Sequence, residues 1–199
     1  GPVRPGLVMA GAVDRLTGPQ LDVDLLAGLD QRRVNIRGTL RSPALAADAQ
    51  GLIDLGTSRF GALKINAALL TPGAMLPNLS GRDVMTHWTL DGPFATPTIG
   101  YNLSAAAIAF SGTGLEGLSA SGKAVVDAKH VLIPVNARAR RVTGLNAAAG
   151  MLLTNVTAVG DFAYSNGKLL SDNLKLKSDK IDATAIVVAD LPSGHYTGA

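Results

Sequence analysis

Apolar and polar residues alternate with a period of two along most of this chain. Leu21, Val23 and Leu25, for example, alternate with Asp22 and Asp24. Successive side chains of an extended strand point to opposite faces, so the alternation predicts strands with one apolar and one polar face. The same pattern recurs over residues 34–40, 63–69, 135–140, 156–162, 174–177 and 181–187. We therefore predict an all-β fold.

Signals for helices are few, and neither candidate is long enough to organise a fold. We expect at most one or two short helices, over Leu145–Leu153 and over Ser80–Thr86. Residues 1–2, Gly-Pro, resemble the remnant of a protease cleavage site. We expect a single elongated β-rich domain over residues 3–199, which is a piece of a longer repetitive β-protein.

A weak internal repeat supports an elongated shape. The pattern Leu-x-x-Pro occurs three times near alternating runs, at Leu16–Pro19, Leu40–Pro43 and Leu90–Pro93. A proline that opens a strand sits where the sheet needs no backbone donor. The repeat predicts hairpins that stack one after another into an elongated sheet with a continuous face.

Two overlapping glycine motifs raise the question of phosphate binding. Gly112, Gly114 and Gly117 spell G-x-G-x-x-G, and Gly117 through Lys123 spell G-x-x-x-x-G-K. Both motifs require a helix whose N-terminus faces the phosphate. After Gly117, however, apolar residues recur with a period of two, and Ala124 replaces the hydroxyl residue that would bind Mg²⁺. We predict a hairpin turn that runs into a strand, and no nucleotide binding.

No other set of residues points to catalysis. The chain has no cysteine, and its three histidines, His87, His130 and His195, are far apart in sequence. Asp83 and His87 would share a face of the predicted short helix, but two ligands do not make a zinc site. We expect no catalytic residue, no metal site and no cofactor, and therefore a binding or structural protein rather than an enzyme.

The charge pattern argues against nucleic acid as a partner. The net charge is only +3 and aromatic residues make up 4% of the chain, too few for a platform on which bases stack. The cluster Arg138, Arg140 and Arg141 is interpreted as a solvated strand face, with contact to anionic lipid headgroups as the alternative.

The apolar strand faces are rich in Ala, Leu, Val and Gly. They fit the closed core of a sandwich or barrel, or else a curved sheet left partly open, whose smooth apolar trough would solvate acyl chains. These two alternatives remain open from composition and periodicity. The residues that would line such a trough are Leu21, Val23, Leu25, Val34, Ile36, Leu40, Leu63, Ile65, Leu69, Val156, Leu174, Leu176, Ile181 and Val187.

Several segments resemble the TamB family of the AsmA-like group, and alphaproteobacterial members most of all. They are Arg140–Gly144, Gly167–Asp182 and Asp190–Tyr196, together with the strand opening Gly38–Ala46. The resemblance spans most of residues 35–199 and rests on alternation plus a few Gly, Pro and Ser-Asp-Lys positions. It brings no catalytic residue with it.

The resemblance implies a tapered, U-shaped β-structure, or β-taco, with an apolar interior. TamB-like proteins are anchored in the inner membrane of Gram-negative bacteria by an N-terminal helix and cross the periplasm. They partner with an outer-membrane Omp85-type barrel, TamA, and are implicated in phospholipid transfer and outer-membrane biogenesis. By this resemblance the chain is a segment of the groove that holds phospholipid acyl chains. Contact with TamA is expected of the full-length protein only.

Two alternatives to a lipid groove remain. Open sheet edges would pair with strands of outer-membrane proteins by β-strand augmentation, which would make the chain an assembly scaffold. A purely structural solenoid needs the same polar and apolar faces. The isolated chain would also form a homodimer if a second copy paired with its exposed edges or its groove.

Overall fold

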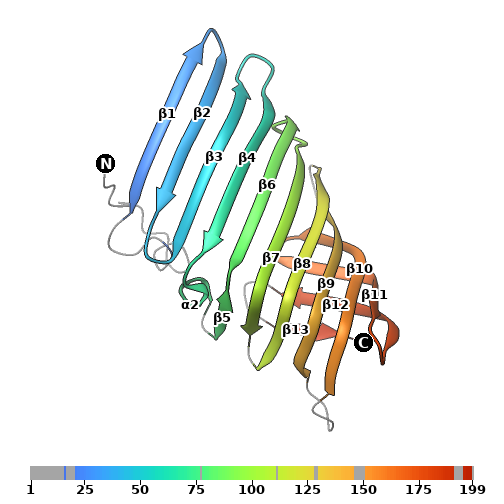
Figure 1. Cartoon of the computed structure of the whole chain (residues 1–199). Helices are drawn as coiled ribbons and strands as arrows, with labels where there is room; N and C mark the ends of the chain where they lie inside the picture. Colours follow the sequence, from blue (N-terminus) through green and yellow to red (C-terminus); the bar gives the residue numbers. More distant parts are fainter. Residues whose placement is uncertain are drawn as a thin grey trace.

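The computed structural model describes residues 16, 21–76, 78–110, 112–127, 130–145, 151–190 and 195–198. These residues form one antiparallel sheet of 13 strands, and the prediction of an all-β fold is confirmed (Figure 1). The strands are β1 (Asp22–Asp30), β2 (Arg33–Arg41), β3 (Leu45–Asp54), β4 (Arg59–Leu69), β5 (Leu79–Arg82), β6 (Val84–Pro93), β7 (Thr98–Phe110), β8 (Thr113–Val126), β9 (Val131–Leu145), β10 (Met151–Ser165), β11 (Lys168–Lys177), β12 (Asp182–Asp190) and β13 (His195–Gly198). The helix α2 (Pro72–Met75) is a single turn between β4 and β5.

Each strand pairs with its neighbour in the chain, with one adjustment at β5 and β6. Both of these strands pair with β7, and they keep one register, since Leu79 lies opposite Phe110 and Met85 lies opposite Ser104. They are therefore one strand interrupted at Asp83, whose backbone has a φ of 54°. The sheet is an up-and-down meander that runs from β1 to β13 without closing.

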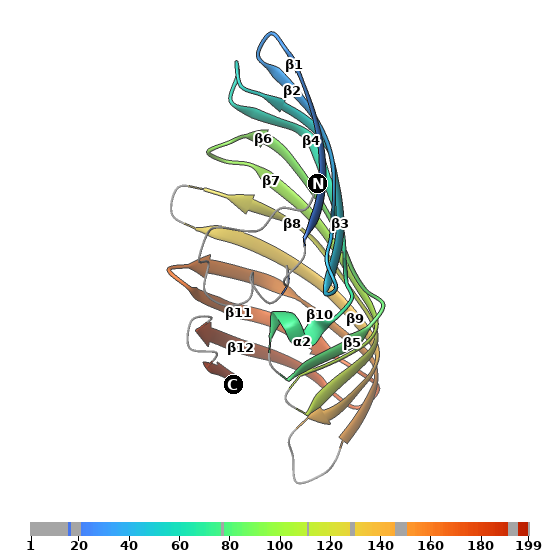
Figure 2. The same cartoon turned by 90° about the vertical axis from the view of Figure 1, so that its left-hand side faces the viewer.

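The sheet is an open, curved trough with a single layer. In Figure 1, β11–β13 lie behind β8–β10, and Figure 2 shows the strands bowed to one side. Among the described residues, every extensive contact joins neighbouring strands of the sheet, or α2 and β5. No second sheet packs over the concave side of the described strands.

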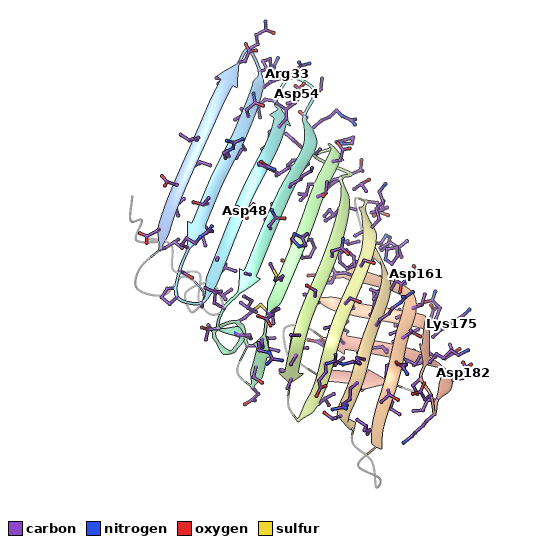
Figure 3. The ribbon with its side chains drawn as sticks, in the orientation of Figure 1. Arg33, Asp48, Asp54, Asp161, Lys175 and Asp182 are labelled. Carbon is purple, nitrogen blue, oxygen red and sulfur yellow. The ribbon has the colours of Figure 1, made fainter. Side chains whose placement is uncertain are left out.

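The pairing register decides which side chains share a face. Val34 of β2 lies opposite Leu29 of β1 and Ile53 of β3, and directly opposed residues of antiparallel strands point to the same side. Following such pairs across the sheet collects the apolar residues on the concave side, here called the inner face. The charged residues collect on the convex side, here called the outer face, where Figure 3 labels Asp48 and Lys175 among others.

A crease crosses the strands from β5 to β10. Asp83, Gly117 and Asn155 have positive φ angles of 54°, 59° and 53°. The strand register places these three residues in one row across the sheet. In the row next to it, each residue lies directly opposite the following one: Arg82, Ala107, Glu116, Arg141 and Thr154.

Side chains change phase at the crease. On β9, Ala139 and Val142 are three residues apart, yet both are buried in the same cluster. On β10, the buried Leu153 and the partly buried Val156 show the same spacing. Two consecutive residues between each pair point outward, so the strands bend toward the inner face at this row.

Both predicted helices are corrected by the structure. Ser80–Thr86 belongs to β5 and β6, because its backbone pairs with β7 on either side of Asp83. The ends of Leu145–Leu153 are strand as well, with Leu145 in β9 and residues 151–153 in β10. Residues 146–150, like residues 1–2, lie outside the described residues. The single helical turn at α2 was not predicted, although Pro72 suits the start of a helix.

Stacked hairpins do form one elongated sheet, but the Leu-x-x-Pro segments do not mark equivalent units of it. Leu40 lies near the end of β2, and Leu90 lies near the end of β6. These two strands run in opposite directions, because an odd number of antiparallel steps (β2 to β3, β3 to β4, β4 to β6) separates them. A stacked hairpin would repeat after an even number of strands. Of the first copy, only Leu16 lies among the described residues.

Candidate functional site

The inner face is the candidate site, and it gathers every predicted trough residue. The register places Val23, Leu40 and Ala47 side by side across β1–β3, and it places Ala158, Leu176 and Ala183 side by side across β10–β12. All fourteen predicted residues lie on this face, from Leu21, Val23, Leu25, Val34, Ile36 and Leu40 through Leu63, Ile65, Leu69 and Val156 to Leu174, Leu176, Ile181 and Val187.

The inner face carries no charge. By register, every Asp, Glu, Lys and Arg of the described strands lies on the outer face. The polar side chains of the inner face are uncharged, such as Thr86 and the buried Ser171. No second layer of described residues covers this uncharged face, and extended apolar patches of this kind mark interaction sites.

Aromatic rings occupy the middle of the inner face. Trp88 and Tyr101 lie opposite each other on β6 and β7, with ring centroids 5.8 Å apart. The Trp88 Nε1 donates to the Thr86 Oγ1 at 3.0 Å, and burial raises the pKa of the Tyr101 phenol. The sequence analysis missed both rings, although the only tryptophan stands in the alternating run Thr86–Leu90, which signals an inward position.

Tyr101 also explains one glycine of the nucleotide-like motifs. Its ring crosses β8 at Gly122, and its hydroxyl donates to the Pro134 carbonyl oxygen at 2.7 Å. A Cβ on Gly122 would lie 2.7 Å from that hydroxyl and 1.9 Å from the Pro134 oxygen. Any side chain here would displace the ring or the strand, so Gly122 allows the close approach.

The rest of the motif region has the predicted strand structure. Gly112 lies in the turn between β7 and β8, and Thr113–Val126 is one continuous strand. The helix that both phosphate motifs require is absent from these residues. Gly117 supplies the left-handed backbone conformation at the crease.

The trough is closed at the crease and open near β1. Ala139, Val142 and Leu153 form a small buried core, against which Leu115, Val156 and Ile181 pack. Near β1 the same face is exposed, and Leu25, Leu40 and Ile65 help to line a shallow depression of about 220 Å³. Each of the two alternatives left by the sequence therefore describes one part of the sheet.

A larger depression lies on the other side of the same strands. It has a volume of about 670 Å³ and is lined on the outer face by residues such as Arg37, Gln50 and Lys64. Its polar and charged rim resembles the rest of the outer face, where Asn66 donates to Asp48 at 2.7 Å and His87 contacts the same Asn66 at 2.7 Å. We therefore assign the apolar site to the inner face.

The outer face also carries an apolar row. It crosses β8–β12 near the rim, with direct pairing from each residue to the next strand: Val125, Leu132, Ala163, Leu170 and Val188, all of which are exposed except the half-buried Ala163. The sequence analysis did not identify this row. Its members come from five strands, and only the register brings them together.

The titratable side chains of the described residues lie apart from one another on the sheet or pair across neighbouring strands. Within these residues, no group of three His, Asp or Glu side chains is placed to hold a metal ion. Asp83 and His87 do not share a helix, because Asp83 lies at the crease and His87 lies in β6. Arg140 and Arg141 both face Glu116 across the sheet, at 3.7 Å and 3.5 Å. The His195 side chain lies outside the described residues.

In the described part of the chain, no helix is long and apolar enough to cross a membrane. Comparison of the chain with protein-family models, with curated proteins and with solved structures finds no significant match.

Proposed function

We propose that the inner face is a groove that carries phospholipid acyl chains. One observation carries the proposal: the inner face of the described strands is uncharged, and no second layer formed by the described residues covers it. Each acyl CH₂ that moves from water onto such a surface gains up to roughly 0.8 kcal/mol. A chain of ordinary length therefore stays in the trough, while the headgroup remains in water.

The mechanism is transfer without covalent chemistry. The lining is mostly Ala, Leu, Val and Gly, with the Trp88 and Tyr101 rings at its middle, and it carries no charge, so an acyl chain can slide from one strand to the next. In this proposal the chain is a groove segment of a periplasmic protein that bridges the inner and outer membranes of a Gram-negative bacterium. A full-length protein would work with an outer-membrane barrel.

The decisive experiment compares two adjacent leucines on opposite faces of β1. Leu25 is 63% exposed on the inner face, and Leu26 is 73% exposed on the outer face. The chain is purified without detergent and titrated with fluorescent palmitoyl-oleoyl phosphatidylethanolamine. We expect Leu25→Asp to weaken lipid binding and Leu26→Asp to leave it unchanged, since only the former places a charge in the trough.

A second variant tests the trough deeper inside. Ile65→Asp, on β4, should reduce the phospholipid found by native mass spectrometry more strongly than Leu25→Asp does. Circular dichroism shows whether the variant still folds. A wild-type chain that takes up no phospholipid overturns the proposal. Equal lipid binding by the wild type and all folded variants also overturns it.

A further inference from the structure

The edge of β1 between Asp24 and Asp30 has the properties of a strand-docking site. β1 hydrogen-bonds to β2 over nine residue pairs without a register slip. No described strand pairs with its other side. Leu25, Leu26 and Leu29 of this strand are 63%, 73% and 69% exposed, the highest values among the described large apolar residues.

Apart from its three aspartates, this edge lacks the features that block pairing with another chain. Natural sheets protect their edges with short strands, bulges, prolines or lysines. β1 is nine residues long, is free of bulges and contains no proline, lysine or arginine. The strand at the opposite end of the sheet, β13, is only four residues long. The described part of β13 therefore offers a shorter backbone edge than β1 does.

The charges of β1 specify the kind of strand that fits. Its outer-face row contains Asp24 and Asp30, and the row beside it on β2 is basic, with Arg33 opposite Asp30 and Arg37 opposite Leu26. A strand added beyond β1 continues the alternation of acidic and basic rows across the outer face if its outward side chains are basic. Opposite charges in directly paired positions are favourable. Its inward side chains must be apolar to continue the inner face.

A second copy of β1 fits this edge poorly. When two antiparallel copies pair along all nine residues, Leu26 lies at the centre, and Asp22 of each copy faces Asp30 of the other. Like charges placed directly opposite destabilise a strand pair. The acidic row therefore favours a basic partner strand over self-pairing.

We propose that the β1 edge from Asp24 to Asp30 binds a partner strand that is basic on its outward side and apolar on its inward side. The partner adds to the sheet as a further antiparallel strand and extends the inner face by one strand. This inference rests on the backbone edge and its charges, and it does not depend on lipid binding.

The test uses a peptide with the sequence of β2, RVNIRGTLR, which has the required pattern of charge and apolarity. The fluorescent peptide is titrated with the full chain and binding is followed by anisotropy. The control peptide has its three arginines replaced by glutamate. We expect the basic peptide to bind at least tenfold more tightly than the acidic control, and less tightly at high salt.

A charge swap in the protein separates specific pairing from adhesion to an exposed strand. The double variant Asp24→Lys and Asp30→Lys should lose affinity for the basic peptide and gain affinity for the acidic one. Failure of both peptides to bind the wild type overturns the proposal, as does equal binding of the two. Sedimentation that shows a concentration-dependent dimer, lost in Leu26→Asp, would assign the edge to a second copy and would also overturn it.

Discussion

The strands near β1 and the strands around the crease follow the same alternating pattern but bury it differently. In β1 the inner-face Leu25 is 63% exposed, whereas Leu153 at the crease is 4% exposed. Both side chains face the same concave surface. The difference arises at the row of Asp83, Gly117 and Asn155, where the strands bend and bring their inner side chains together. Alternation sets the two faces, and the bend decides where a face becomes a core.

The largest effect should come from removing a side chain at the crease. Leu153→Ala should lower the free energy of unfolding by about 3 kcal/mol, because it leaves a cavity in the buried cluster. Leu25→Ala should change it by less than about 0.5 kcal/mol, since the side chain is mostly in water. Urea unfolding of both variants measures the contrast. Similar losses at the two sites would show that the open trough is packed as tightly as the crease.

A glycine pair tests the same contrast by adding atoms. Gly122→Ala should destabilise the chain by about 2 kcal/mol, because the new Cβ collides with the Pro134 oxygen and the Tyr101 hydroxyl. Gly28→Ala in β1 is the matched control, since a Cβ there has no atom within 4 Å. Thermal unfolding of both variants checks the prediction. A Gly122→Ala variant as stable as Gly28→Ala would contradict the close approach of Tyr101 to β8.

The crease itself is tested at its glycine. Gly117→Ala should cost about 1 kcal/mol, because a residue with a Cβ is disfavoured at a φ of 59°. Ala62, at a bulge in β4, has a φ of 49°, so Ala62→Gly should stabilise the chain by about 0.5 kcal/mol. Unfolding midpoints in urea should shift in opposite directions. Shifts of the same sign would argue against left-handed backbone at one of the two positions.

The smallest effect concerns pH and the turn between β11 and β12. Hydrogen bonds from the Thr154 hydroxyl and the Asn155 amide hold the pKa of Asp179 below its ordinary value of 3.8. Because the folded-state pKa is lowered, this carboxylate stabilises the fold above pH 3.8, and the contribution is lost as the pH falls through the folded value.

Asp179→Asn checks that sign. The wild type should be more stable than the variant at pH 7, and the two should converge as the pH falls below 3.8. Thermal unfolding across this range measures the difference. A gap that stays constant with pH would mean that the Asp179 charge does not contribute to the turn.

The faces of the sheet were predictable from the sequence because antiparallel pairing preserves alternation. Once Val34 faces inward, the residues directly opposite it on the neighbouring strands, Leu29 and Ile53, must face inward as well. The strand after Gly117 was predictable for the same reason, since Leu118 and Ala120 already alternate.

The crease and the outer apolar row could not be read from the sequence. Asn155 shares its left-handed backbone conformation with Gly117 and Asp83, which lie in the same row across the sheet. Only the strand register shows which residues share a row. The error at Ser80–Thr86 has the same origin, because a break at Asp83 looks like a helix until β7 is seen pairing on both sides. The identity of β1 as an open edge likewise depends on the strand order.

The strictly sequential pairing of the strands has a consequence for how such a protein changes its length. Among the described residues, each strand makes its extensive contacts with the strands beside it in the sheet, so stability depends on local interfaces and not on a closed topology. Insertion or loss of a whole hairpin leaves the direction and face of every other strand unchanged. The hairpin is therefore the natural unit of growth, and homologous chains of different span can evolve by gaining or losing strands in pairs.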